Sequence, residues 1–411
     1  MELRPILSAM RHRKTGVILI ALQVALTLAI LSNALYVVRD RLDEAHRISG
    51  VDEAVVFHVS VLDKERDTTG AVTDADLDAL RGMPGVVDAV WVNQVPLSNS
   101  GNNSGFSVPS ASGKPGDKLE TNAATYMGDT NISSTWGLRL VEGRDFRPGE
   151  GLLIDEELPD AAKPKVALVT LALAKRLFPN DASWVGKPFW WGDTGPIEII
   201  GVVDTLVSPW GRASWGGDGT RSVIFPARTV QNWRTYAVRV DAPGALAQIA
   251  RDADELLAKR VAGRLSGGVR TMSETRERRY RGEHTLVNGL VIVMGLLLVM
   301  TASGIVGLAS LWVNQRRKQI GVRRALGATR ADILRLFLTE NLLITGFGVL
   351  VGCGLALAVN QVMMRELELT RLPLEYLGLG AMVLLMLGVL AVLAPALRAA
   401  AVPPAVATRS V

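Results

Sequence analysis

The chain has 411 residues, of which 48% are hydrophobic, and its mean hydropathy is +0.24. This balance is more apolar than a water-soluble chain of this length usually needs, and it indicates a membrane protein. The single cysteine, Cys353, excludes a disulfide framework or a cysteine-based metal site within one copy. The net charge of +5 is unevenly spread, because residues 39–283 have 30 basic and 34 acidic side chains (−4) and the remainder has 15 and 6 (+9).

Four stretches contain no Asp, Glu, Lys or Arg, and each is long enough to cross a bilayer core as a helix, which takes about 20 residues. These runs are 15–38, 284–315, 341–364 and 376–397, and from them we predict transmembrane helices over 15–38, 284–314, 337–364 and 376–397. The first stretch is longer than the apolar core of a signal peptide, about 7–15 residues, and no small-residue cleavage site follows Tyr36. We therefore expect it to be a retained anchor.

Basic residues near the ends of the spans predict the orientation, because such residues stay in the cytoplasm. Four precede the first span, seven lie between spans two and three, and Arg398 and Arg409 follow the fourth. The loop 365–375 has only Arg365 and Arg371. In a bacterial inner membrane, the segments 1–14, 315–336 and 398–411 are therefore expected in the cytoplasm, and the domain 39–283 and the loop 365–375 in the periplasm.

The second charge-free run has 32 residues, about 48 Å as a helix, which exceeds the ~30 Å of hydrocarbon. We expect its helix to continue upstream through 274–283, where Glu274 and Arg278, and Glu277 and Arg281, are four residues apart and can pair. Together with residues 39–49, this extension would form a stalk. The alternative is that both segments are only the solvated ends of the spans.

The periplasmic domain has two halves in which strands and a helix alternate. A strand at 54–62, a helix from Thr73 with Asp76 as its capping partner, and a strand at 86–95 form the first half. Strands at 221–227 and 235–243, a helix at 244–263 and a short strand at 267–273 form the second. This pattern predicts a large α+β domain, with a ferredoxin-like, porter-type base that carries an inserted lobe at about 98–220.

The insertion begins with a Gly/Ser/Asn-rich loop at 98–118. Four tryptophans lie further on among glycines and are candidate partner contacts, with burial in the lobe as the alternative: Trp190, Trp191, Trp210 and Trp215.

No HExxH, GxSxG or GxxxxGK[ST] motif occurs, so we expect no catalytic residue, no metal site and no ATP bound by a phosphate loop. A carboxylate pair in this acid-rich domain is the alternative to solvated surface charge.

The cytoplasmic segment combines charge with a helix–break–helix pattern. Ile320, Val322 and Leu326 recur along a short helix that Gly327 can end. Thr329 with Asp332 then forms a capping-box signature that opens a second helix. A membrane anchor that holds anionic headgroups explains the charges but not this order. Nucleic-acid binding is disfavoured, because no aromatic residues lie among the charges.

Two further features concern the spans. Gly348 and Gly352 form a GxxxG pattern in the third span, which is a candidate dimer contact. No Asp, Glu, Lys, Arg or His lies in the middle of the four charge-free runs, which disfavours an ion-coupled transporter.

The chain resembles the FtsX-like permease family of the MacB type, the mechanotransmission (type VII) class of ABC transporters. RRKQIGVRRALGATRADILRLFLTENLLI (316–344) is similar to the cytoplasmic connection of that family between spans two and three. Residues 137–146 and 165–205 resemble its periplasmic core domain, and 395–409 its closing segment. MacB itself has a fused ATPase, whereas this sequence shows none.

The resemblance implies a non-enzymatic permease subunit that works as a dimer with a second copy or a paralogue, in contact with membrane lipid. ATP and Mg would be bound by a separate cytoplasmic ABC ATPase subunit. The residues matching its docking segment are Ile320, Gly321, Val322, Arg323, Arg324, Ala325, Leu326 and Gly327. Of these, Ile320 and Leu326 are the expected apolar contacts, and Arg323 and Arg324 the charged ones.

The sequence departs from the family at Gln319, where members often have an acid, and at Pro403 and Val406. Export or efflux, with a periplasmic adaptor and an outer-membrane channel, is the favoured function. The alternatives are lipoprotein release or control of a periplasmic enzyme without transport.

Overall fold

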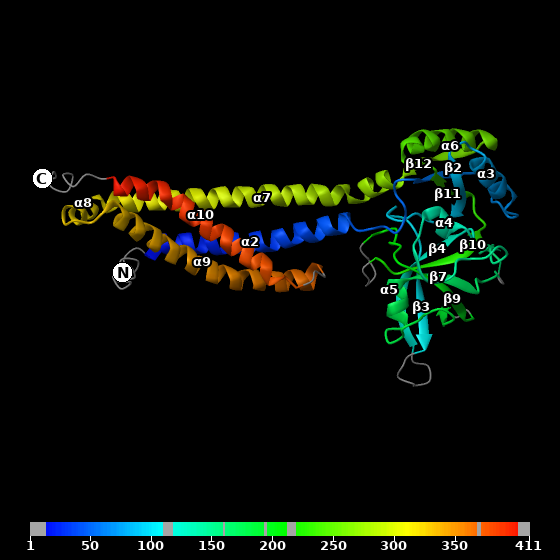
Figure 1. Ribbon diagram of the computed structural model, residues 1–411, viewed down its shortest axis with the longest axis horizontal. Coiled ribbons are helices and arrows are strands. Elements are labelled where there is room, and N and C mark those ends of the chain that lie inside the picture. Colours follow the sequence, from blue (N-terminus) through cyan, green and yellow to red (C-terminus); the bar gives the residue numbers. More distant parts are fainter. Residues whose placement is uncertain are drawn as a thin grey trace. The chain divides into compact units, whose positions relative to one another are not determined.

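The computed structural model describes residues 14–109, 118–158, 161–192, 195–211, 219–367 and 371–401. The chain divides into a helical unit, made of residues up to Asp43 and from Glu283 onward, and an α/β unit, Glu44–Gly282 (Figure 1). Each unit has its own hydrophobic core.

The helical unit contains the four predicted spans, which are confirmed as helices long and apolar enough to cross a membrane. They are α2 (Lys14–Ala45), α7 (Met272–Gln315), α9 (Arg330–Leu367) and α10 (Leu374–Ala400), with the short helix α8 (Arg317–Ala325) between α7 and α9. The 44-residue α7 is a single helix that includes the polar segment 274–283, and α9 begins seven residues before the predicted span.

Helix α9 packs against α2 through its small residues. A Cβ added to Gly348 would lie 2.8 Å from the Ala21 carbonyl oxygen, and one added to Gly352 would lie 3.0 Å from the Ala25 Cα. The dimer contact predicted for these two glycines is therefore corrected. Their surface is occupied by α2 of the same chain, and sequence spacing alone cannot tell which helix a GxxxG face meets.

Polar side chains add hydrogen bonds between these helices. The Thr27 and Thr301 hydroxyls, 2.8 Å apart, join α2 to α7, and the Asn341 amide donates to the Gly388 carbonyl at 3.0 Å, joining α9 to α10.

The base of the α/β unit has the strand order β12–β1–β11–β2, and all three pairings are antiparallel. In chain order its elements are β1 (Val56–Leu62), α3 (Ala71–Arg81), β2 (Val86–Val92), β11 (Trp233–Val240), the 3-10 turn η1 (Pro243–Ala245), α6 (Leu246–Arg260) and β12 (Leu265–Thr271). This order is that of a ferredoxin-like, split βαβ motif. Leu77 and Leu80 of α3 and Ile249, Ala253 and Leu257 of α6 bury one face of each helix.

Helix α3 starts earlier than the sequence suggests. Its N-cap is Gly70, with φ of 77°, and Thr73 lies inside the first turn. The Thr73 amide and hydroxyl both donate to Asp67, at 2.8 and 2.7 Å. The acceptor oxygen near the start of α3 therefore comes from the Asp67 carboxylate and not, as predicted, from the Thr73 hydroxyl.

The lobe is inserted between β2 and β11. It consists of β3 (Asn103–Pro109), β4 (Lys118–Gly128), α4 (Ile132–Trp136), β5 (Leu140–Gly143), β6 (Leu152–Ile154), β7 (Val166–Thr170), α5 (Leu171–Leu177), β8 (Pro188–Trp191), β9 (Ile197–Val203) and β10 (Ser222–Thr229). Strand β10, predicted for the base, pairs instead with β4, β7 and β6. The lobe therefore extends past the predicted boundary at 220, because a continuously buried strand does not show its partners in its sequence.

Candidate functional site

Helix α8 is set off from α7 and α9 by two sharp breaks. Gly327, with φ of 99°, ends the turn after α8 in a conformation that favours glycine. Helix α9 then begins with a reciprocal cap, in which the Thr329 amide donates to the Asp332 carboxylate at 3.0 Å and the Asp332 amide donates to the Thr329 hydroxyl at 3.2 Å. The break between α8 and α9 thus uses the residues that the sequence singled out, whereas α7 and α8 are separated by Arg316 alone.

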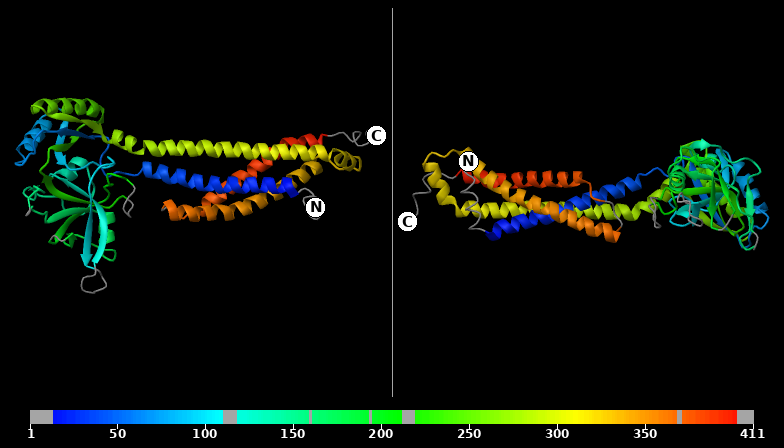
Figure 2. Two further views of the ribbon diagram at one scale, coloured as in Figure 1. Left: turned by 180° about the vertical axis from the view of Figure 1, so that it is seen from behind. Right: turned by 90° about the horizontal axis from the view of Figure 1, so that it is seen from below.

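One side of α8 is attached to the rest of the helical unit. Arg316, Ile320 and Arg324 are four residues apart and thus share a helix face. Arg316 pairs with Glu340 of α9, and Ile320 is 4% exposed within the apolar cluster that includes Phe337 and Ala396. The Arg324 guanidinium donates to the Ala400 carbonyl of α10 at 3.2 Å. Figures 1 and 2 show α8 beside the C-terminal end of α10 in every view.

The other side of α8 faces outward. Val322 is 51% exposed and Leu326 is 83% exposed. Arg317, Lys318, Arg323, Ala325 and Gly327 are exposed as well, whereas Gly321 is buried. The expected docking residues thus divide between two faces: Val322, Arg323 and Leu326 are available to a partner, while Ile320 and Arg324 contact their own chain.

The pairing of Glu340 with Arg316 was not predicted from the sequence. There, Arg316 is one of seven basic residues, and Glu340 directly precedes the charge-free run 341–364. An acid inside a predicted membrane helix needs a partner, because an isolated charge there is costly. The presence of Glu340 in a predicted membrane helix therefore indicated that a cation lies nearby, although it did not identify Arg316 as that cation.

Three of the four candidate tryptophans lie within the described residues and are half-buried. Trp191 stacks on Phe225, with ring centroids 5.3 Å apart and planes 8° apart, which favours the alternative of packing in the lobe. Trp190 is half-buried on β8 opposite Ser107. The half-buried Trp210 accepts hydrogen bonds at its carbonyl from Arg279, at 2.6 and 3.1 Å. Trp215 lies outside the described residues.

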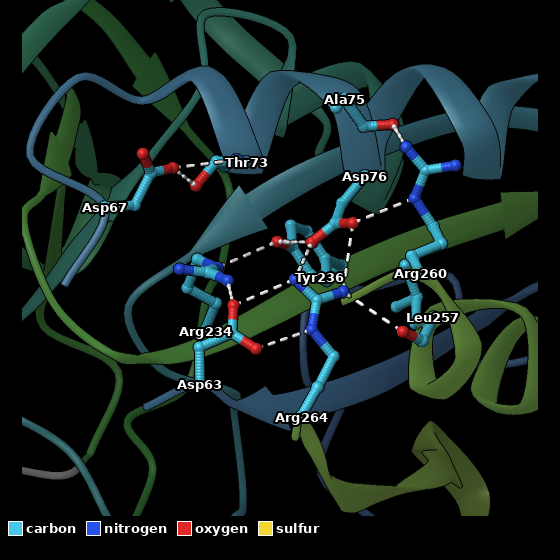
Figure 3. Close-up of polar contacts among 10 residues, drawn as sticks. All are labelled: Asp63, Asp67, Thr73, Ala75, Asp76, Arg234, Tyr236, Leu257, Arg260 and Arg264. Atoms are coloured by element: carbon cyan, nitrogen blue, oxygen red, sulfur yellow. Dashed lines mark hydrogen bonds and ion pairs between the residues drawn. The ribbon is translucent and has the colours of Figure 1, made fainter. Parts of the chain in front are cut away.

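The α/β unit holds a buried ionic network that offers no free catalytic group. Asp76 accepts hydrogen bonds from Tyr236, Arg260 and Arg264, and Asp63 pairs with Arg234 and Arg264 (Figure 3). Among the described residues, no group of three or more His, Cys, Asp or Glu is placed to hold a metal ion. The arrangement of the network therefore supports a structural role.

A cleft of about 400 Å³ lies between base and lobe, and the charges that line it are also paired. Arg228 of β10 bridges Asp129 and, at 2.6 Å, Asp74 of α3. Both carboxylates of the cleft, Asp74 and Asp129, are therefore held by the same guanidinium. Helix α8 is therefore the better candidate site.

Two family models match the chain. The MacB-like periplasmic core domain matches residues 15–256, and the FtsX-like permease C-terminal model matches residues 291–404.

Curated relatives include the pyoverdine export ATP-binding/permease protein PvdT of Pseudomonas fluorescens strain Pf-5, 24% identical over 355 residues that cover 84% of this chain and 49% of that protein. The macrolide export ATP-binding/permease protein MacB of Rhodospirillum rubrum is 28% identical over 235 residues, which cover 56% of this chain and 35% of that protein. The chain thus spans half the length or less of these relatives.

Among solved structures, the periplasmic region of MacB from Actinobacillus actinomycetemcomitans matches with 12% identity and a TM-score of 0.34, over 57% of this chain and 95% of that one.

Proposed function

This chain belongs to the MacB-type, FtsX-like permease family of ABC transporters, and we propose that it is an export permease whose helix α8 receives a separate ATP-hydrolysing subunit. The observation that carries the proposal is the two-sided structure of α8. Its exposed side presents Val322 and Leu326 beside Arg323. Apolar contacts with a charged rim are typical of protein interfaces.

The proposed mechanism transmits force and involves no chemistry in this chain. ATP and Mg bind to the partner subunit, which pushes on the exposed side of α8. Because the opposite side of α8 is attached to α9 and α10, the displacement reaches the spans as a whole. Helix α7 continues without a break from Gln315 back to Met272 and would transmit it to the α/β unit, on the other side of the membrane.

Export is favoured because the curated relatives are named as exporters of pyoverdine and macrolides. The proposal includes a second copy or paralogue and a periplasmic orientation of the α/β unit. Crosslinking from that unit separates export from regulation. An exporter is expected to yield an adaptor or outer-membrane channel, and a regulator a hydrolase.

The docking claim is tested with tagged full-length chain purified from its native membranes, with ATP hydrolysis measured in the purified complex. Val322→Asp with Leu326→Asp should lower the co-purified ATPase activity at least tenfold, because two desolvated apolar contacts become charged. The matched control is Leu265→Asp, which changes a leucine of the α/β unit that is 62% exposed. Equal activity in the wild type and the double variant would remove the docking claim.

A further inference from the structure

A single ion pair joins the start of α8 to the body of α9. The Arg316 guanidinium meets the Glu340 carboxylate with both arms, Nη1 to Oε2 at 2.7 Å and Nη2 to Oε1 at 3.0 Å. The Arg316 side chain is 14% exposed and that of Glu340 is 7% exposed. Two parallel charge-assisted hydrogen bonds fix both the distance and the orientation of the two groups.

The pair lies where the end of α7, the start of α8 and the body of α9 come together. Arg316 is the residue between the end of α7 and the start of α8. Glu340 lies ten residues after the start of α9, which is about 15 Å along the helix axis. Trp312 of α7 and Phe337 of α9 are buried in the adjoining apolar cluster. The bond therefore connects the α7–α8 junction to a point well inside α9.

We propose that Arg316 and Glu340 are positioning residues that make α8 move together with α7 and α9. This role deepens the proposed function and rests on it where ATP-driven motion is concerned. Without the pair, the first half of α8 keeps its chain connection to α7 and the apolar packing of Ile320, but no side-chain polar bond of Arg316 to α9. The second half keeps the bond from Arg324 to Ala400. Loss of the pair should therefore loosen α8 most at its N-terminal end.

Headgroup binding is a weaker explanation for Arg316. Both terminal nitrogens of its guanidinium already donate to the Glu340 carboxylate, and the side chain is mostly buried. A buried charge whose partner is removed is left without compensation. Substitution of either residue should therefore destabilise the position of the other. This mutual dependence separates a pair that positions α8 from two unrelated charges.

The experiment uses full-length chain in lipid nanodiscs without ATPase or nucleotide. Cys353 is replaced by Ala so that a spin label can be placed at Lys318, near the start of α8, or at Leu326, near its end. Glu340→Gln should at least double the mobile fraction at Lys318 and change it less at Leu326. Asn341→Ala is the matched control, because it removes the neighbouring bond from α9 to Gly388 and leaves Arg316 paired.

The reversed pair, Arg316→Glu with Glu340→Arg, should return the label at Lys318 to the wild-type mobility. Glu340→Asp, one methylene shorter, serves if Glu340→Gln cannot be recovered, and it should give an intermediate mobile fraction. Wild-type mobility in Glu340→Gln or Glu340→Asp, or equal loosening in Asn341→Ala, would overturn the positioning role.

A second measurement separates this inference from the proposed function. In the complex purified with its ATPase, Glu340→Gln should retain the bound subunit and lose most of the stimulation of its ATP hydrolysis by the permease. Absence of a bound ATPase on the wild-type chain would contradict the proposed function, while the nanodisc result would still decide whether the pair positions α8.

Discussion

The buried charges of the α/β unit and those of the helical unit are organised differently. In the base, Asp63 and Asp76 share Arg264 and have further partners in Arg234, Arg260 and Tyr236 (Figure 3). At α8, one carboxylate meets one guanidinium. Removal of any ion from its partner is costly in both places.

The difference lies in what each arrangement holds together. The network connects β1, α3, β11 and the segment from α6 to β12, so it fixes a whole domain through overlapping bonds. The Arg316–Glu340 pair fixes one junction, while Val322 and Leu326 on the outward side of α8 stay exposed. Many shared bonds suit a rigid body, whereas a single bond suits a junction through which a displacement must pass.

The largest expected effect follows from breaking the network at Asp76, which is almost fully buried. Asp76→Ala leaves Arg264 and Arg260 without a shared carboxylate and should cost about 3–5 kcal/mol of unfolding free energy. Urea unfolding followed by tryptophan fluorescence measures it, because every tryptophan except Trp312 lies in the α/β unit. The control Asp252→Ala, on the exposed side of α6, should stay within about 0.5 kcal/mol of the wild type.

Close backbone approach between α2 and α9 contributes to the packing of the helical unit, and Gly348 tests this contribution. Gly348→Leu forces atoms into the space held by Ala21 and Val24 and should destabilise the unit by about 1–3 kcal/mol. Gly354→Leu on the same helix is the control, since an added Cβ there meets no described atom within 4 Å. Thermal unfolding in detergent distinguishes them, and equal melting temperatures would contradict the assigned α2–α9 contact.

The buried, neutral His58 should make the stability of the α/β unit depend on pH. His58 accepts a hydrogen bond from the Trp136 indole at 3.2 Å, and burial lowers its pKa to about 3. In the unfolded chain the pKa of His58 is ~6.5. Below pH 6.5, His58 is therefore protonated in the unfolded chain but stays neutral in the folded chain. Stability should therefore fall by about 1.4 kcal/mol per pH unit, or roughly 2 kcal/mol from pH 6.5 to 5.

His58→Gln removes this titration and should flatten the dependence of unfolding free energy on pH over the same interval. Parallel pH curves for the variant and the wild type would show that His58 is not the source of the slope.

The smallest expected effect is at the rim of α8. Arg323 is exposed, so Arg323→Glu should weaken ATPase binding by a few-fold and leave α8 in place, as is typical of charges at the edge of an interface. Arg324→Glu should in addition raise the mobility of a spin label at Leu326, because it loses its bond to Ala400. Identical behaviour of the two variants in both measurements would argue against two separate faces.

Local features of the fold could be predicted from the sequence, because their signals are contained in short segments. Charge-free runs predict the four helices, and Gly327 with Thr329 and Asp332 predicts the break between α8 and α9. Partners distant in the chain could not be predicted. The periodicity of β10 shows burial but not its neighbours, and the small residues Gly348 and Gly352 fit any closely packed helix. Glu340 signals a need for a cation without identifying Arg316 among seven basic residues.

The most direct test of the docking claim is site-specific photocrosslinking in native membranes. A benzophenone amino acid is placed at Val322, at Leu326 and, as a control, at the exposed Leu265 of the α/β unit. We predict that positions 322 and 326 both form adducts with the same ATP-binding subunit, and that position 265 forms no adduct with it. Lipid adducts alone at 322 and 326, or the same protein adducts at all three positions, would contradict the role of α8 as the ATPase-docking helix.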